Sequence, residues 1–265
     1  MNTFYRLWLF RDYVLSAIIT DLRYRYTRSA LGGVWAILQP LAQAAIFAVV
    51  MSVIMQARLP GMTSTTSYGA YLLSGLLGWN LFVDGVNQGL GLFLRHANTI
   101  KKVRFPLLSL PIIAGGITTL NHALLLLATL FILSLLGFAP LAPKVWLMLP
   151  VLWLLTLGLG LGLGLMLGIV NVFMRDLEIV VPIVLQLMFW FSAIVYSPSV
   201  LPELYQRLLL INPMAGIVQA YHTVLVFDQW PEWFWLAYPA ALVVVFFTLA
   251  AWLFKRCFVQ MVDIL

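Results

Sequence analysis

The chain has 265 residues, of which 63% are hydrophobic and only 9% are charged. With a mean hydropathy of +1.01, it lacks the charged surface that a soluble domain needs, so the sequence indicates an integral membrane protein. The formal net charge is +6, but the basic residues form no exposed stripe, which argues against nucleic-acid binding. The single cysteine, Cys257, excludes an internal disulfide and a cysteine-based metal cluster.

Residues 1–32 differ from the rest of the chain because charged residues interrupt them repeatedly, which no signal peptide would allow. Apolar residues recur at helical spacing, although Arg11 falls on the apolar stripe and Phe10 falls off it. We expect an amphipathic helix in the plane of the inner leaflet, with its basic side toward lipid phosphates; a soluble cap helix is the alternative. The apolar positions are Phe4, Leu7, Trp8, Leu15, Ile18, Ile19 and Leu22.

Six later segments have the roughly 20 apolar residues that a helix needs to cross a membrane, so we expect an all-α protein with six transmembrane helices. A further uncharged stretch lies between Arg207 and Asp228. Asn212-Pro213 interrupts it, and because each half is too short to cross alone, we expect a re-entrant or interfacial helical pair. The six predicted spans are residues 33–56, 68–94, 107–136, 146–173, 179–197 and 233–254.

The distribution of positive charge favours six spans over seven. With the N-terminus inside, six spans place twelve Lys and Arg residues in the cytoplasm and three outside, in agreement with the positive-inside rule. A seventh span would move Lys255 and Arg256 outside, so we expect both termini in the cytoplasm. The inner residues are Arg6, Arg11, Arg23, Arg25, Arg28, Arg95, Lys101, Lys102, Arg104, Arg175, Lys255 and Arg256, and the outer residues are Arg58, Lys144 and Arg207.

The densest positive charge lies between spans two and three, in residues 95–106. Lys101, Lys102 and Arg104 occur there within four residues, which is typical of a cytoplasmic loop because Lys and Arg resist translocation. A topology anchor and a docking site for a cytoplasmic partner are both compatible with this loop.

The sequence contains no catalytic constellation. It has no G-x-x-x-x-G-K-[ST] phosphate loop, no nucleophile elbow and no H-E-x-x-H helix, and its three histidines lack the spacing of metal ligands. Asp84 is a carboxylate inside span two, and charge within a bilayer is expensive and usually functional. A polar, water-accessible helix face would also accommodate it, and a proton relay would find a partner only in His122.

Two patterns concern helix packing and a path for cargo. Gly160, Gly164 and Gly168 fall at i, i+4 and i+8 on span four, which allows the backbone of another span to approach closely. In span five, Phe189 and Trp190 lie one turn from Gln186. Such aromatic faces suit the apolar faces of sugar rings; packing against lipid or a neighbouring helix is the alternative.

Four motifs occur in order along the chain: residues 21–40 (DLRYRYTRSALGGVWAILQP), 98–106 (NTIKKVRFP), 171–176 (NVFMRD), and 212–214 (NPM) followed by 219–221 (QAY). Together they resemble the membrane subunit of ABC exporters for O-antigen, capsule or teichoic acid polymers. The resemblance covers essentially the whole chain, and the four motifs together are far more specific than any one of them.

The resemblance implies a six-span permease domain over residues 33–265, working as a homodimer with two copies of a separate ABC ATPase in the bacterial inner membrane. ATP and Mg²⁺ would be bound by that partner, with no cofactor in this chain, and the cargo would be a lipid-linked polysaccharide. The implied site residues are Asn98, Lys101, Lys102 and Arg104 in a coupling loop, Trp35, Gln186, Phe189, Trp190 and Tyr196 in the channel lining, and Asn212, Pro213 and Tyr221 in outer gate helices within residues 198–230.

Other functions stay open at this point. A drug or lipid exporter of the related class would have a closed lateral pocket, whereas a polymer exporter would have a continuous aromatic-lined channel. A membrane enzyme acting on sugar lipids would need acidic, His or Arg residues clustered at one membrane face. The nearest such group, Arg175 and Asp176 with Glu178, is better explained as a turn between spans four and five. A membrane scaffold would leave the polar residues in the spans unexplained.

Overall fold

The computed structural model describes residues 11–27, 32–50, 65–102, 108–138 and 142–265, and every regular element within these ranges is helical. The elements in chain order are α2 (Arg11–Thr27), η1 (Gly32–Val34), α3 (Trp35–Val49), α4 (Thr65–Leu90), α5 (Leu92–Arg95), α6 (Ala97–Lys102), α7 (Ser109–Leu135), α8 (Pro143–Phe173), α9 (Leu177–Trp190), η3 (Pro198–Val200), α10 (Glu203–Leu209), α11 (Pro213–Leu225) and α12 (Trp233–Ile264).

Among the described helices, α7, α8 and α12 are each long and apolar enough to cross a membrane. The pair α10 and α11 is bent by 98°, and its halves together have the length and composition of a fourth crossing. The bend falls at Asn212-Pro213, where the sequence predicts the interruption. The chain is therefore an all-helical protein with three or four candidate spans by length and composition.

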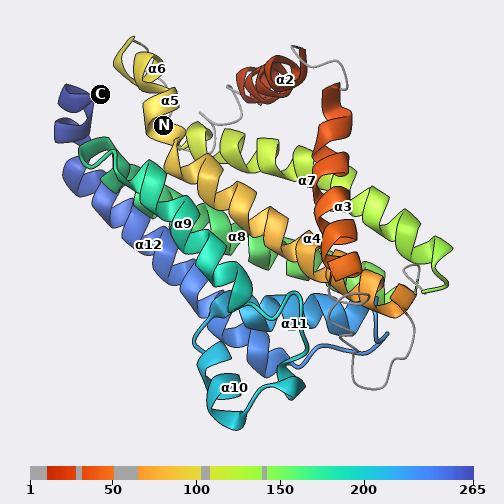
Figure 1. The fold of residues 1–265 in the computed structure, drawn as a ribbon. Helices are drawn as coiled ribbons and strands as arrows, with labels where there is room; N and C mark the ends of the chain where they lie inside the picture. Colours follow the sequence, from red (N-terminus) through yellow and green to blue (C-terminus); the bar gives the residue numbers. More distant parts are fainter. Residues whose placement is uncertain (1–10, 28–31, 51–64, 103–107, 139–141) are drawn as a thin grey trace.

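The centre of the molecule is the contact between α4 and α8, which run alongside each other (Figure 1). A Cβ atom added to Gly160 would lie 2.6 Å from the carbonyl oxygen of Phe82, and one added to Gly164 would lie 2.5 Å from that of Val86. Gly168 meets the α4 backbone in the same way. The two backbones therefore approach so closely that a larger residue does not fit, which is how small residues join helices in membranes.

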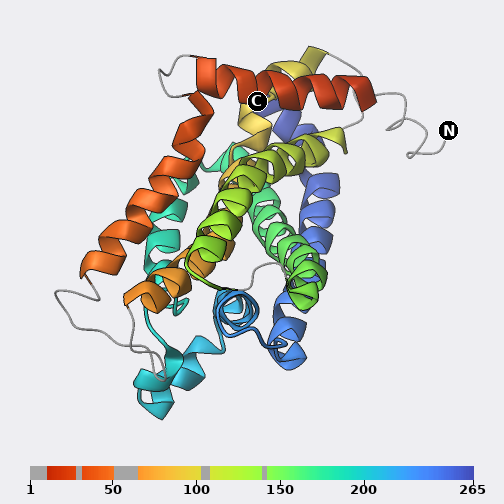
Figure 2. The same ribbon diagram turned by 90° about the vertical axis from the view of Figure 1, so that its right-hand side faces the viewer.

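At one end of the molecule, α11 lies across the bundle and is seen end-on in Figure 2. Its Tyr221, expected to be a gate residue, is only 1% exposed. The Tyr221 ring fills the space in front of Gly78 on α4, where an added Cβ would lie 2.7 Å from the ring. This tyrosine therefore belongs to the packed core between α11 and α4.

At the opposite end, α2 lies across the bundle (Figures 1 and 2). Val14 and Ile18 are buried, and Ile18 rests against Gly116 of α7. Leu15 and Ile19 are exposed instead, so the apolar residues of α2 are divided between a face packed on the protein and a face open to its surroundings. We expect an interfacial helix over residues 1–32, and the structure describes residues 11–27 of it.

The two ends differ in charge. The end that carries α2 also carries α5, α6, the turn between α8 and α9, and the last residues of α12 (Figure 1). At the other end lie Lys144, at the start of α8, and Arg207, in α10. The described basic residues toward the α2 end are Arg11, Arg23, Arg25, Arg95, Lys101, Lys102, Arg175, Lys255 and Arg256.

The predicted spans 68–94, 107–136 and 146–173 correspond closely to α4, α7 and α8, whereas α9 is shorter than expected. It ends at Trp190 and not at residue 197, because the chain turns sharply and Ala193 adopts a φ of 52°. A helix of 14 residues is about 21 Å long, less than the roughly 30 Å of a hydrocarbon core. The end predicted for span one, at residue 56, lies outside the described ranges.

Candidate functional site

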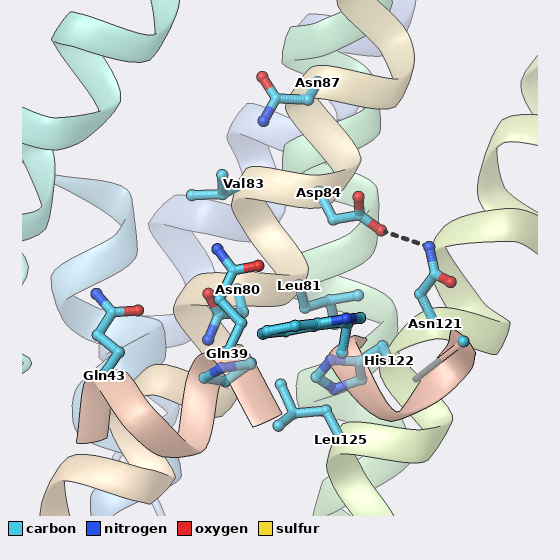
Figure 3. A pocket seen from close by; sticks show the side chains of 13 residues that line it. Gln39, Gln43, Asn80, Leu81, Val83, Asp84, Asn87, Asn121, His122 and Leu125 are labelled. Atoms are coloured by element: carbon cyan, nitrogen blue, oxygen red, sulfur yellow. Dashed lines mark hydrogen bonds between the residues drawn. The ribbon is translucent and has the colours of Figure 1, made fainter. Parts of the chain in front are cut away.

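A pocket of about 420 Å³ lies between α3, α4 and α7 (Figure 3). We call it the amide pocket because carboxamide side chains from all three helices line it. Gln39 and Gln43 are one turn apart on α3 and so lie on the same side of that helix. The polar residues of α4 recur at helical spacing as well. The polar and indole lining residues are Trp35, Gln39, Gln43, Asn80, Asp84, Asn87, Asn121 and His122.

Asp84, the carboxylate inside predicted span two, lines this pocket (Figure 3). The Nδ2 atom of Asn121 on α7 donates a hydrogen bond to its Oδ2 atom over 3.4 Å. A charged group within a membrane protein is tolerated where it faces a polar cavity and a hydrogen-bond donor. His122, the partner that the sequence suggested, lines the same pocket, and its neighbour Asn121 is a hydrogen-bond donor to Asp84.

Some polar groups of the amide pocket lack a hydrogen-bond partner among the described residues. Gln39 and Asn87 are exposed at the pocket, and Gln43 is half-buried. Asn80 Nδ2 and His122 Nε2 are buried and have no partner in the described part of the chain. Buried polar atoms without partners are uncommon in folded proteins, so these two groups are available to water or to a ligand in the pocket.

An aromatic cluster joins α3, α4 and α9. The ring of Phe189 stacks on Phe47 of α3 with 5.5 Å between centroids, and it meets Trp79 of α4 edge-on at 5.7 Å. Phe189 is therefore buried, whereas Trp190 is 44% exposed. Of the two aromatic residues predicted to line a channel, Trp190 has its ring open to the surroundings. Gln186 lies one turn earlier and is also exposed.

Residues 191–196, which we call the outer turn, are held by two tyrosines of α4. Tyr68 Oη donates to the carbonyl oxygen of Val195 over 2.7 Å. Tyr71 Oη donates to that of Tyr196 over 3.0 Å. These carbonyl groups lie beyond the end of α9, where no helical N–H is available to bond them. The tyrosine hydroxyls donate the hydrogen bonds that they need. This places Tyr196, expected in the channel lining, in a turn fixed to α4.

Asn212 joins the outer turn to α11. Its Nδ2 atom donates to the carbonyl oxygen of Phe191 and to Ser192 Oγ, both over 2.9 Å. Its Oδ1 atom accepts from the backbone N–H of Met214 over 3.0 Å, which caps the N-terminus of α11. Pro213 occupies the first turn of α11, where its missing N–H costs nothing. The Asn-Pro pair thus begins α11 and also positions the turn before it.

At the α2 end, Arg95 fixes the start of the basic loop to α4. One guanidinium nitrogen, Nη2, donates to both the backbone oxygen of Gln88, over 2.6 Å, and its Oε1 atom, over 2.8 Å. Burial lowers the pKa of His96, Arg95 lowers it further, and Asp21 of α2 acts in the opposite direction. α2 and the α5–α6 segment lie at the same end of the bundle (Figure 1).

The four residues expected to couple to an ATPase lie in or directly after α6. Asn98 and Lys101 are exposed on this helix. Lys102 is its last residue, and Arg104 lies outside the described ranges. Asn98 and Lys101 are thus exposed on the surface at the α2 end of the molecule.

The described residues place no group of three or more His, Cys, Asp or Glu side chains where it could hold a metal ion. Their polar chemistry is hydrogen bonding by carboxamide, carboxylate and imidazole groups in the amide pocket. The sequence interpretation missed Gln39, Gln43 and Asn121. A signal existed, since Gln39 and Gln43 are polar residues one turn apart in an apolar span.

The chain matches the ABC-2 type transporter family over residues 13–226, most of its length, and it belongs to that family. The ABC-2 membrane proteins are transport subunits and not enzymes, and the family implies an ABC ATPase partner.

Three relatives illustrate where the chain lies within this family. It is 27% identical over 206 residues to the O-antigen export system permease protein RfbA of Klebsiella pneumoniae, covering 77% of each chain. It is 27% identical over 253 residues to a protein of the same name from Myxococcus xanthus, covering 94% of each chain. It is also 24% identical over 206 residues to the polysialic acid transport protein KpsM of Escherichia coli, covering 78% of each chain.

Proposed function

We propose that this chain is the permease subunit of an ABC transporter that exports a lipid-linked polysaccharide across the bacterial inner membrane. The observation that carries the proposal is the similarity to an O-antigen export permease over 94% of the chain. A second similarity, to a polysialic acid transport protein, supports a glycan polymer as the class of cargo. The partner ATPase binds ATP and Mg²⁺ and drives the transport.

The proposed topology has six spans, formed by α3, α4, α7, α8, α9 together with the outer turn that follows it, and α12, with both termini in the cytoplasm. The concentration of basic residues at the α2 end supports this orientation, because Lys and Arg are retained in the cytoplasm. The helices α10 and α11 then form short gate helices on the periplasmic side, held to the bundle by Asn212.

Transport of a polymer needs a continuous path, which we place between two copies of the chain. The exposed face of α9 carries Ile183, Leu187 and Trp190, each at least 44% exposed, and Gln186 lies among them. An apolar face of this kind is covered by lipid or by a second subunit. In the homodimer, Trp190 and Gln186 line the channel and offer weak, exchangeable contacts to a sliding glycan, as conduction requires.

The ATPase docks on the α5–α6 segment. Reversing charge at its surface with Lys101→Glu and Lys102→Glu should weaken copurification of the ATPase several-fold, because interfacial charge reversal is costly. Arg207→Glu, at the opposite end of the molecule, is the matched control and should leave copurification unchanged. Membrane insertion is checked first, since these lysines also set topology. Normal ATPase binding by the correctly inserted double variant would contradict the docking site.

Deleting the gene tests the export function directly. We expect the surface polymer to disappear, lipid-linked polymer to accumulate inside the cell, and the wild-type chain to restore export. A deletion strain that keeps its surface polymer would contradict the proposal. Loss of resistance to a drug in such a strain would assign small-molecule export instead.

A further inference from the structure

We propose that the amide pocket binds a sugar residue of the lipid-linked glycan, close to its lipid anchor, before the chain is exported. The inference rests on the proposed function and adds a binding site within one subunit, apart from the exposed face of α9. Its residues come from α3, α4 and α7.

The lining of the pocket suits an uncharged ligand rich in hydroxyl groups. Carboxamides carry a donor and an acceptor in one plane, and a carboxylate accepts from hydroxyls. No described lining residue is Lys or Arg, so the described part of the lining offers hydrogen-bonding groups and a carboxylate but none of the cations that recognise phosphate. Trp35 is 48% exposed and offers an aromatic face. A sugar has hydroxyl groups at its rim and an apolar ring face, which matches this combination.

The hydrogen-bonding state of the pocket favours a binding site over a self-contained polar network. A structural network satisfies its own buried groups. Here His122 is only 5% exposed, and its Nε2 atom has no partner in the described structure. Asn80 Nδ2 is in the same state, and Figure 3 shows Asn80 grouped with Gln39 and Gln43 on one side of the pocket. The volume of about 420 Å³ lies within the roughly 300–1,000 Å³ of small-molecule sites.

The position of the pocket matches the part of the glycan nearest the lipid. Gly32 and Trp35, which follow the connection from α2, both line it. Because α2 lies across this end of the bundle (Figure 2), the pocket lies in the inner-leaflet half of the proposed topology. A glycan anchored in that leaflet presents its first sugars at this level, without crossing the hydrocarbon core.

Photo-crosslinking in the intact permease–ATPase complex tests this site. The photoreactive residue p-benzoylphenylalanine replaces Gln39, which is exposed at the pocket, in cells that make the polymer. After irradiation the permease is purified under denaturing conditions. Bound glycan is detected through its vicinal hydroxyls by periodate oxidation and a hydrazide reporter, which needs no knowledge of the sugar. The same substitution at Gln43 gives a second position if the first variant does not assemble.

Two reference positions make the result decisive. Trp190 reports the proposed channel face, and Leu154 of α8, which is 61% exposed and lines no part of the pocket, reports background. We expect label at Gln39 and Trp190 but not at Leu154, and none in cells that do not make the polymer. Label at Trp190 with only background at Gln39 would overturn the pocket and leave the proposed function intact. Background label at every position would overturn both.

A second substitution asks whether the pocket binds through its amides. In the Gln39 crosslinking chain, Asn80→Leu should reduce the label about two- to tenfold, the effect of one lost hydrogen bond. Asp263→Asn, an exposed carboxylate change on α12, should leave the label unchanged. Label that persists undiminished with Asn80→Leu would contradict recognition by this pocket.

Discussion

The two faces of α4 use their residues in opposite ways. Toward α8, Gly85 and Gly89 lie against the backbone of the helical turns that contain its glycines. Close steric fit holds this contact together. Toward α3 and α7, Asn80, Asp84 and Asn87 line the amide pocket, where Asn80 Nδ2 and His122 Nε2 have no hydrogen-bond partner among the described residues. The first face is optimised for packing, whereas the second keeps hydrogen-bonding groups available at a cost in stability, as functional sites commonly do.

Two residues at the outer end of α4 also stabilise the fold. Tyr68 and Tyr71 donate their hydroxyl protons to carbonyl groups of the outer turn, so their polar groups are fully engaged in holding the fold. Substitutions on the packed face and at the outer turn should therefore change stability first. Substitutions in the pocket should change transport first.

The largest effect on folding is expected for Gly164→Ala. The added Cβ would lie 2.5 Å from the carbonyl oxygen of Val86, and a backbone neighbour can yield only if the helices separate. Overpacking of this kind costs about 1–3 kcal/mol, which should lower the thermal unfolding midpoint of the purified complex. Gly69→Ala is the control, since no atom from another described element lies within 4 Å of its added Cβ. Equal midpoints for the two variants would show that α4 and α8 are not in close contact.

A smaller loss of stability is expected for Asn212→Ala. The substitution removes the N-cap of α11, worth about 0.5–2 kcal/mol, together with two hydrogen bonds to the outer turn. We expect a lower unfolding midpoint and faster proteolysis of the segment from residue 191 to 212. Asn98→Ala, on the exposed surface of α6, serves as the control. Proteolysis at the wild-type rate would show that Asn212 does not hold the outer turn to α11.

The smallest change in stability, with a large change in transport, is expected for Asp84→Asn. The carboxamide keeps the shape of the side chain and an oxygen that accepts from Asn121, so this hydrogen bond is retained in the variant. Export should fall, because a ligand hydroxyl loses a charged acceptor, and charge-assisted hydrogen bonds are roughly twice as strong as neutral ones. The rate of appearance of polymer at the cell surface measures this. An unchanged rate of export would show that Asp84 does not bind the ligand.

Features that depend on residues close together in sequence could be predicted. The spacing of Gly160, Gly164 and Gly168 indicates close packing whatever the partner helix is, and these glycines lie against α4. Asn212-Pro213 indicates a break in an apolar stretch, and the bend between α10 and α11 falls there.

Features that depend on the relative rotation of helices could not be predicted. Whether Phe189 or Trp190 points outward is decided by Phe47 and Trp79 on other helices. The end of α9 is set in part by Asn212, 21 residues beyond the carbonyl group that it binds. The amide pocket likewise requires three helices to turn their polar residues toward one another, and one sequence alone does not fix those rotations.

The most direct measurement of the central claim compares Asn80→Leu with Asn121→Leu for thermal unfolding and export. Asn80 Nδ2 is buried without a partner in the described protein, so an apolar residue of similar shape should leave the unfolding midpoint equal or higher while export falls. Asn121→Leu removes a donor to Asp84 and should lower both. If Asn80→Leu lowered the midpoint and left export at the wild-type rate, the pocket face of α4 would be structural, contrary to this account.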